Sequence, residues 1–120
     1  MQWRFSGGRP VYQQIMEQIQ GAILAGQLPP GSRVMAVREL AMEANVNPNT
    51  MQRALMELER EELLVSCGTM GRFVTSDKAV LEGLRLRLQK ETALECARQL
   101  QAVGLTLEQA AQILQEGENA

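Results

Sequence analysis

A polar tip on a strongly amphipathic helix constrains the fold of this chain more than any other feature. The stretch NVNPNTMQRALMELERE, residues 45–61, begins with small polar residues around Pro48 and continues as a strong helix former. Its apolar residues recur at helical spacing: Met51, Ala54, Leu55 and Leu58. The helix therefore buries one face, while a single side chain is enough to cap its N-terminus. The remaining amide and hydroxyl groups at this end need another explanation.

Two further helices are predicted before it. Between residues 11 and 25 the apolar residues fall on one face of an amphipathic helix. The segment QLPPGSR, residues 27–33, is predicted to be a turn because its two adjacent prolines exclude helix. A short helix follows over residues 37–43, and the segment 45–47 breaks its pattern. Two short helices joined by a turn of about four residues form a helix-turn-helix.

A β-hairpin is predicted after the helix-turn-helix. The runs 64–66 and 72–74 have β-type sequences and flank a connection that contains Gly68 and Gly71. A lone hairpin is only marginally stable in water, so we expect it to pack on the helices. The order of helix, helix-turn-helix and hairpin describes a winged helix, which we assign to residues 1–76. The predicted fold is mainly α with a small β-hairpin.

Residues 77–120 are predicted to form a two-helix C-terminal dimerisation region, or a region that senses an effector. One long helix spans 78–103, and the sequence Thr106-Leu107-Glu108-Gln109 is a capping box that opens the last helix. Two helices of this size cannot enclose a core between them, so a second copy of the chain is expected to cover their apolar faces. The residues predicted at this interface are Leu81, Leu84, Leu88, Ala97, Leu100, Leu107, Ala111 and Leu114.

The composition argues against an enzyme, a metalloprotein and a membrane protein. The 120-residue chain has no histidine, the commonest general base and metal ligand, and no nucleophile–base pair or phosphate loop is apparent. Cys67 and Cys96 lack a CxxC spacing, so we expect reduced thiols, no metal and no cofactor. No apolar run approaches the ~18 residues of a membrane span, and the N-terminus lacks a signal-peptide core. We therefore expect a cytoplasmic, non-enzymatic protein.

The formal net charge of −2 does not exclude nucleic acid as a partner. Arg33, Arg38 and Arg53 fall in a stretch that holds only Glu39 and Glu43. An acidic protein can therefore carry a small basic face.

Three segments together resemble a known family. They are RPVYQQIMEQIQGAILAGQLPPGSRV, VRELAMEANVNPNTMQRALMELEREELL and GRFVTSD. In this order and spacing they are similar to the N-terminal DNA-binding domain of GntR-type bacterial transcription regulators, from about Pro10 to Asp77. The resemblance is greatest to the YtrA subfamily, whose members carry only two short helices after the winged helix. It implies a homodimeric repressor that binds a palindromic double-stranded operator, and it suggests control of a transporter operon.

The recognition helix of such a protein enters the major groove by its tip. Short polar side chains there can reach bases or phosphates, so Asn49, Thr50 and Gln52 are predicted to contact DNA. Asn47 is predicted to cap the helix, to contact DNA, or both. Arg53 is predicted either to clamp a phosphate or to pair with Glu57.

The resemblance also implies roles outside this helix. Arg38 occupies the arginine of the family's R-x-L-A motif, which implies a phosphate or base contact; the alternative is a solvated arginine that pairs with a nearby glutamate. In the wing, Gly71 would allow close approach to DNA, and Arg72 or Thr69 would add a contact, unless the segment is a plain hairpin turn.

The sequence departs from the family pattern at three places. Met35-Ala36 replaces the common Pro-Ser, which removes a hydroxyl cap and a phosphate contact. The wing reads Gly68-Thr69-Met70-Gly71 where Gly-x-Gly is commoner, and Pro48 stands where many relatives have arginine. Fewer basic contacts predict weak nonspecific binding with a shallow salt dependence.

Two other functions fit parts of the sequence. A winged helix without DNA binding could dock a protein partner through the acidic segment Glu57–Glu62. Some GntR relatives fuse this domain to an aminotransferase-like one, but this chain ends too soon for such an enzyme. The two C-terminal helices leave little room for a metabolite pocket, and the effector is unknown.

Overall fold

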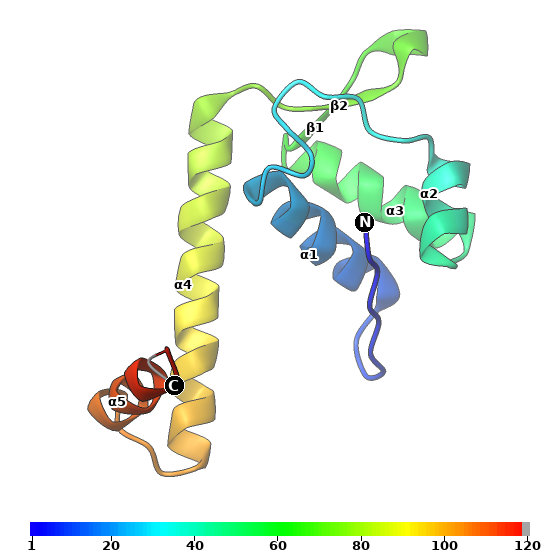
Figure 1. Cartoon of the computed structure of the whole chain (residues 1–120). Helices are drawn as coiled ribbons and strands as arrows, with labels where there is room; N and C mark the ends of the chain where they lie inside the picture. The colour runs from blue at the N-terminus through cyan, green and yellow to red at the C-terminus, as the bar shows by residue number, and fades with distance from the viewer. Residues whose placement is uncertain (119–120) are drawn as a thin grey trace. The chain divides into compact units, whose positions relative to one another are not determined.

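The computed structural model of the chain describes residues 1–118, and within them it is mainly helical with one small antiparallel sheet (Figure 1). The elements in order are α1 (Val11–Leu24), α2 (Val37–Ala44), α3 (Pro48–Arg60), β1 (Leu64–Ser66), a 3-10 turn (Gly68–Met70), β2 (Arg72–Val74), α4 (Lys78–Ala102) and α5 (Leu107–Glu118). This order confirms the predicted winged helix followed by two helices.

The chain divides into two compact units, Met1–Leu84 and a second that begins at Arg85. The division lies inside α4, whereas the sequence analysis placed the boundary at residue 76, between the predicted hairpin and the long helix. The first turns of α4 thus belong to the winged-helix unit. Leu84, expected at the dimer interface, is only 3% exposed in the single chain.

The core of the first unit forms where α1 and α2 pack on α3. Its largest fully buried side chains are Ile15, Ile19, Met51, Leu55, Leu58, Leu63, Leu64 and Val74. Each such aliphatic side chain contributes about 1.5–3 kcal/mol by leaving water. The predicted helical stripe of α3 is therefore its buried face, and this fixes which polar residues of α3 face outward.

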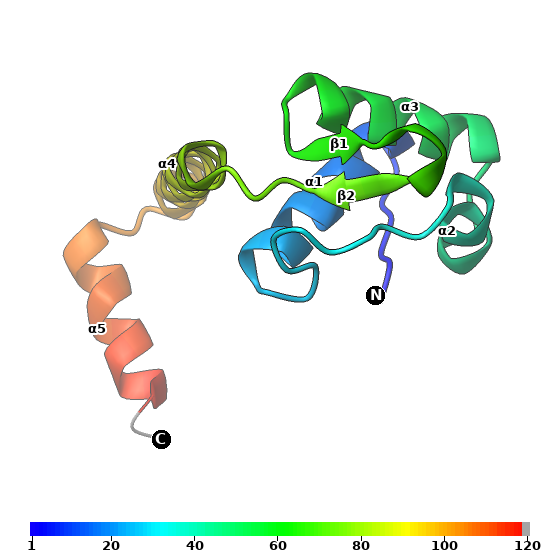
Figure 2. The same ribbon diagram turned by 90° about the horizontal axis from the view of Figure 1, so that it is seen from above.

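The hairpin is extended by the loop before α2 (Figure 2). In the hairpin itself Leu64 pairs with Val74, Val65 with Phe73 and Ser66 with Arg72. On the other side of β2, the Val34 amide donates to the Arg72 carbonyl at 2.9 Å and the Val74 amide donates to the Ser32 carbonyl at 2.8 Å. The end of the segment predicted only as a turn thus lies extended beside β2, where Arg33 forms an isolated bridge with Phe73.

Residues 1–9 form a strap along α1 that the sequence analysis did not predict. Gln18 and Gln14, one helical turn apart, bond to the strap backbone with their amides. The Gln18 side chain exchanges hydrogen bonds with the Arg4 amide and carbonyl at 2.9 and 2.8 Å. Gln14 does the same with Ser6, at 2.9 Å in each direction. Two glutamine side chains thus replace the backbone partners that an isolated extended segment lacks.

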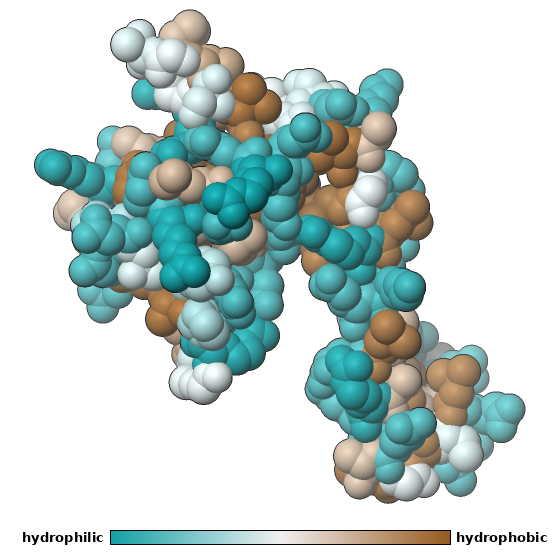
Figure 3. All heavy atoms as spheres, turned by 180° about the vertical axis from the view of Figure 1, so that it is seen from behind, coloured by the Kyte–Doolittle hydropathy of each residue, from teal (hydrophilic) through white to brown (hydrophobic). Residues whose placement is uncertain are grey.

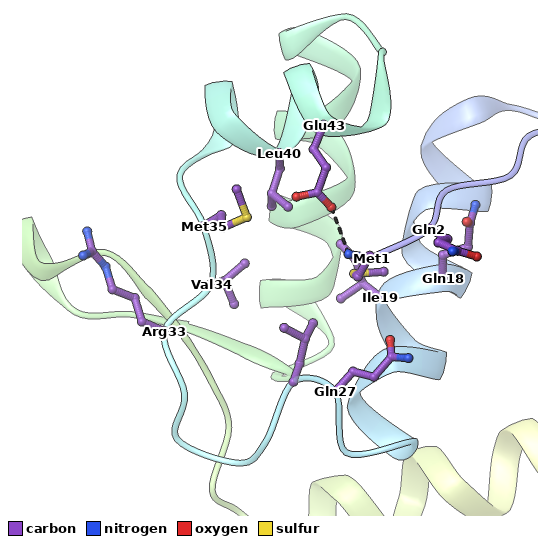
Figure 4. A pocket seen from close by; sticks show the side chains of 11 residues that line it. Met1, Gln2, Gln18, Ile19, Gln27, Arg33, Val34, Met35, Leu40 and Glu43 are labelled. Carbon is purple, nitrogen blue, oxygen red and sulfur yellow. Dashed lines mark hydrogen bonds and ion pairs between the residues drawn. The ribbon is translucent and has the colours of Figure 1, made fainter.

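The strap also reaches α2. The Trp3 indole N–H donates to Glu43 Oε1 at 2.9 Å, and the Met1 amino group lies 3.2 Å from the same oxygen. The hydrogen bonds from Trp3 and Met1 hold the pKa of Glu43 below its ordinary value. Beneath these contacts is a cavity of about 830 Å³ with Ile19, Val34 and Leu40 among its lining residues (Figure 4).

The second unit contains the end of α4 and α5. Gly104, with φ of 73°, ends α4 in the left-handed conformation, and the Leu105 amide donates to the Leu100 carbonyl at 2.9 Å. The predicted capping box is confirmed, because Thr106 and Gln109 exchange hydrogen bonds at 3.0 and 3.1 Å. Apolar side chains remain at the surface of this unit (Figure 3), including Leu107 at 77% and Leu114 at 69% exposure.

The interface residues predicted on α4 do not share one face. At about 100° per residue, Leu81, Leu84 and Leu88 lie on one face, and Ala97 and Leu100 lie on another that is rotated by about 150°. Ala97 and Leu100, with Cys96, instead line a cavity of about 500 Å³ beside the connection to α5. Most of the side chains that line it are exposed, so the expectation that the tail leaves little room for an enclosed metabolite pocket stays a prediction.

Candidate nucleic-acid interface

The tip of α3 is built by Asn47 and Pro48. The Asn47 side-chain oxygen accepts from the Asn49 amide at 2.7 Å, which confirms its capping role, and Pro48 occupies the first helical position. Since Asn47 caps the helix alone, the side chains of Asn49 and Thr50 are not needed for capping. Asn49 is exposed and Thr50 is half-buried. The tip therefore presents polar groups outward.

Arg53 lies one turn further along α3, and an aromatic ring holds it in place. Its guanidinium carbon is 3.8 Å from the centroid of the Tyr12 ring, within the range of a cation–π contact. Glu57, the other partner considered for Arg53, lies 3.2 Å from Arg60 instead. Because a ring carries no formal charge, Arg53 keeps its positive charge available for a phosphate.

Arg38 lies in the first turn of α2 and is exposed. Within residues 1–118 it has no ion pair with a glutamate, the alternative considered for it. Ala36 is the N-cap residue of this helix and provides no side-chain cap, as the Met35-Ala36 departure predicted. The free amides of this first turn add a partial positive charge close to Arg38.

Arg72 is the first residue of β2, and its side chain bonds to two residues of α3. Its Nε pairs with Glu59 Oε1, which also accepts from the Ser66 hydroxyl at 2.8 Å. Its terminal nitrogen donates to the Gln52 side-chain oxygen at 3.5 Å. Burial raises the pKa of Glu59, but the hydrogen bonds from Arg72 and Ser66 and the Arg72 charge outweigh burial and leave that pKa below its ordinary value. A residue predicted to contact DNA thus also joins the wing to the recognition helix.

The wing turn contains Thr69 and Gly71. Thr69 is exposed in the 3-10 turn. Gly71 has φ of 109°, a conformation that favours glycine. The Arg33 side chain packs against it, because a Cβ on Gly71 would lie 3.2 Å from Arg33 Nε. Gly71 is therefore required by the hairpin backbone itself, and Arg33 places a second cation beside the wing.

The acidic segment Glu57–Glu62, at the C-terminal end of α3, is largely paired within the chain. Glu57 lies beside Arg60, Glu59 bonds to Arg72, and Glu61 accepts from Gln20 at 3.0 Å. These contacts use the carboxylates that a basic protein partner would need. The segment is therefore a poor docking face for such a partner.

The polar and basic groups of the α3 tip, of α2 and of the wing come together on one side of the first unit. The N-terminal end of α3, α2 and the tip of the hairpin lie on this side in both views (Figures 1 and 2). Sequence reasoning missed two contributors: Tyr12, which supports Arg53, and Glu59, which holds Arg72. It counted Arg33 in the basic face but assigned no contact to it. The sequence contains no local signal for Tyr12 or Glu59, because their partners lie far away along the chain.

No helix within residues 1–118 is long and apolar enough to cross a membrane. The chain is similar to several transcription regulators. The HTH-type transcriptional repressor YtrA of Bacillus subtilis is 32% identical over 100 residues, which are 82% of this chain and 77% of YtrA. A GntR family transcriptional regulator from Listeria monocytogenes has a TM-score of 0.84 at 30% identity and covers 93% of this chain and 98% of its own.

The DNA-binding domain of AraR, solved in complex with operator ORX1, is similar in fold. Its TM-score is 0.58 at 28% identity, over 62% of this chain and 96% of that domain. The family model of bacterial regulatory proteins of the gntR family matches residues 11–74, from the start of α1 to the end of β2. This match covers the whole winged helix and more than half of the chain. The chain therefore belongs to the GntR family, whose members are transcription regulators and not enzymes.

Proposed function

We propose that this chain is a repressor that binds operator DNA as a homodimer. The observation that carries the proposal is the tip of α3, where Asn47 alone caps the helix and Asn49, Thr50 and Gln52 are left to read bases. The names of two relatives, the repressor YtrA and the operator-bound domain of AraR, support it.

The proposed contacts divide by chemistry. Asn49, Thr50 and Gln52 face base edges in the major groove, where amide and hydroxyl groups distinguish base pairs. Arg38 and Arg53 hold phosphates on either side and fix the register without reading sequence. Thr69 and the backbone at Gly71 are the parts of the wing that contact the neighbouring DNA strand.

The second copy is proposed to bind through the tail. Leu107 and Leu114 lie on one face of α5 and are largely exposed, so their burial in a dimer is favourable. Ala111 lies between them on this face, and Ala97 and Leu100 border it from α4. Leu84 is already buried and adds no free surface. In this proposal the operator of the two-fold dimer is a palindrome, and, following the YtrA-type resemblance, it precedes a transporter operon and the protein acts in the bacterial cytoplasm.

Titration of the purified protein against its own upstream DNA and against random DNA tests the proposal. N49A is expected to lose about 1–3 kcal/mol on the operator if Asn49 reads a base, and much less on random DNA. R38A is expected to weaken both about equally, and a second titration at higher salt should show one fewer released counterion.

R60A is the matched control, because Arg60 lies on the same helix at its far end and is exposed. It is expected to leave operator binding unchanged. Equal losses for N49A on operator and random DNA would contradict base reading by Asn49. Absence of any preference for the upstream DNA would contradict the repressor assignment itself.

A further inference from the structure

Gln52 and Arg72 lie together although one belongs to the recognition helix and the other to the wing. Gln52 and Glu59 are seven residues apart on α3, so they share a face of the helix about two turns apart. The Arg72 side chain spans both, with Nε on Glu59 and a terminal nitrogen 3.5 Å from Gln52 Oε1. The Ser66 hydroxyl bonds to the same Glu59 oxygen from the neighbouring strand at 2.8 Å.

This arrangement fixes the orientation of the Gln52 amide. A guanidinium has only N–H donors and no acceptor. The amide group that faces Arg72 must therefore be the oxygen, and the NH₂ group points away from it. Arg72 cannot easily turn aside, because its ion pair with Glu59 is largely shielded, with side-chain exposures of 18% for Arg72 and 28% for Glu59.

The free groups of Gln52 decide which base it can read. Bidentate reading of adenine needs both parts of the amide, because the oxygen accepts from adenine N6 while the NH₂ donates to N7. The amide oxygen has two lone pairs, of which Arg72 occupies one. The positive guanidinium beside the other lone pair disfavours the approach of the adenine N6 amino group, whereas the NH₂ donors stay free. Guanine presents two neighbouring acceptors in the major groove, O6 and N7. We infer that Arg72 is a specificity-determining residue, which orients Gln52 to donate to guanine and makes adenine a poor substitute.

The inference rests on the proposed function, since it needs Gln52 to reach a base. Selection of binding sites from a randomised operator by the full-length wild type and by Q52A identifies the base pair that Gln52 reads. That position is expected to be guanine in the wild type and to lose its preference in Q52A. At this position the wild type is expected to bind guanine about 5–150-fold more tightly than adenine, the range of one good base contact.

Two substitutions of Arg72 then separate orientation from mere packing. R72M keeps the length and apolar stem but has no donor, so it frees the Gln52 oxygen for adenine. The guanine-over-adenine ratio is expected to fall by about tenfold or more, within the range of a lost or gained base contact. R72K keeps a donor beside the oxygen and is expected to retain the preference. A residue that only packs the wing would weaken binding to both bases equally and would leave their ratio unchanged.

Modified bases test the same point in the wild type alone, independently of the folding of any variant. Replacement of the guanine by 2-aminopurine removes O6, and replacement by 7-deazaguanine removes the N7 acceptor. Each is expected to weaken binding if the NH₂ group donates to guanine. A wild-type preference for adenine at the Gln52 position, a ratio that R72M leaves unchanged, or full binding to both modified bases would overturn the inference while operator binding stands. Loss of all sequence preference in the wild type would instead overturn the proposed function.

Discussion

At the scale of single residues, the backbone is strained at Glu62, just after α3, and a substitution can relieve this strain. Glu62 has φ of 67°, and its amide donates to the Glu59 carbonyl at 2.9 Å where the helix ends. Asn45 has a similar φ of 56° after α2, but asparagine tolerates this region far better than a longer side chain. Glycine is the usual residue in such a C-terminal cap because it has no Cβ to clash.

E62G is therefore expected to stabilise the fold by about 0.5–1 kcal/mol, which is the relief of left-handed strain less the greater chain entropy of glycine. Urea unfolding of the full chain measures it. E62A is the matched control, since it removes the same charge but keeps a Cβ, and it should give no comparable gain. Equal stability of the two variants would mean that charge, and not backbone strain, dominates at this site.

Tyr12 supports Arg53 from α1, and its contribution can be separated from that of its hydroxyl group. Y12L removes the ring face below the guanidinium, which is worth about 0.5–1 kcal/mol at an exposed site. Operator binding and random-DNA binding are both expected to weaken by about twofold to fivefold, as measured by fluorescence anisotropy. Y12F keeps the ring and should bind like the wild type. A loss in Y12F as large as that in Y12L would assign the effect to the hydroxyl group.

At the scale of elements, α2 begins without a side-chain cap. Ala36 has φ of −61° and ψ of 152°, the extended conformation that an N-cap residue adopts, but its methyl group accepts no hydrogen bond. Glu39 stands three residues later, where it would complete a capping box with a serine at the N-cap. A36S is expected to raise the free energy of unfolding by about 1 kcal/mol.

Thermal unfolding of A36S beside M35S tests this cap. Met35 precedes the N-cap, so a serine there is not in the capping position and should not stabilise α2. If both substitutions stabilise the chain equally, the gain does not come from capping.

The elements themselves were largely predictable, because each depends on a local pattern. The spacing of apolar residues located the five α-helices that the structure has within residues 1–118, and the Thr106–Gln109 box fixed the start of α5. The predicted ends of α1 and α4 were each one residue too long, at Leu24 and Ala102 in the structure, and that of α2 was one residue too short, at Ala44. Such differences are usual at fraying helix ends.

What the sequence could not reveal are contacts between segments far apart along the chain. The pairing of Tyr12 with Arg53, of Glu59 with Arg72, and of the strap with Gln14 depends on tertiary packing. The burial of Leu84 could not be predicted either. From the sequence, an apolar side chain at this position fits a dimer interface as well as the core of the single chain, and only the structure shows that it is buried within the chain. The site was therefore predicted as a set of exposed groups, without the contacts that orient them.

At the scale of the whole molecule, α4 is the continuous helix that leaves the winged-helix unit and enters the tail. In the proposed dimer, the tails hold two such helices together, so they set the distance between the two recognition helices. Half-sites of a palindrome must then lie about one helical turn, ~10 bp, or a multiple apart on one face of the duplex. Binding by such a dimer therefore depends on the spacing of the half-sites, whereas binding by independent monomers does not.

Insertion of about half a turn, ~5 bp, at the centre of the operator turns the half-sites to opposite faces. The affinity of the wild type is expected to fall to that of a single half-site. The double variant L107E/L114E places charges on the exposed face of α5 and should be a monomer by light scattering, because unpaired charges oppose burial in a dimer. It should bind the original and lengthened operators equally, at the single-half-site level. Wild-type binding that ignores the insertion, or a double variant that remains dimeric, would contradict a rigid two-fold dimer joined through the tails.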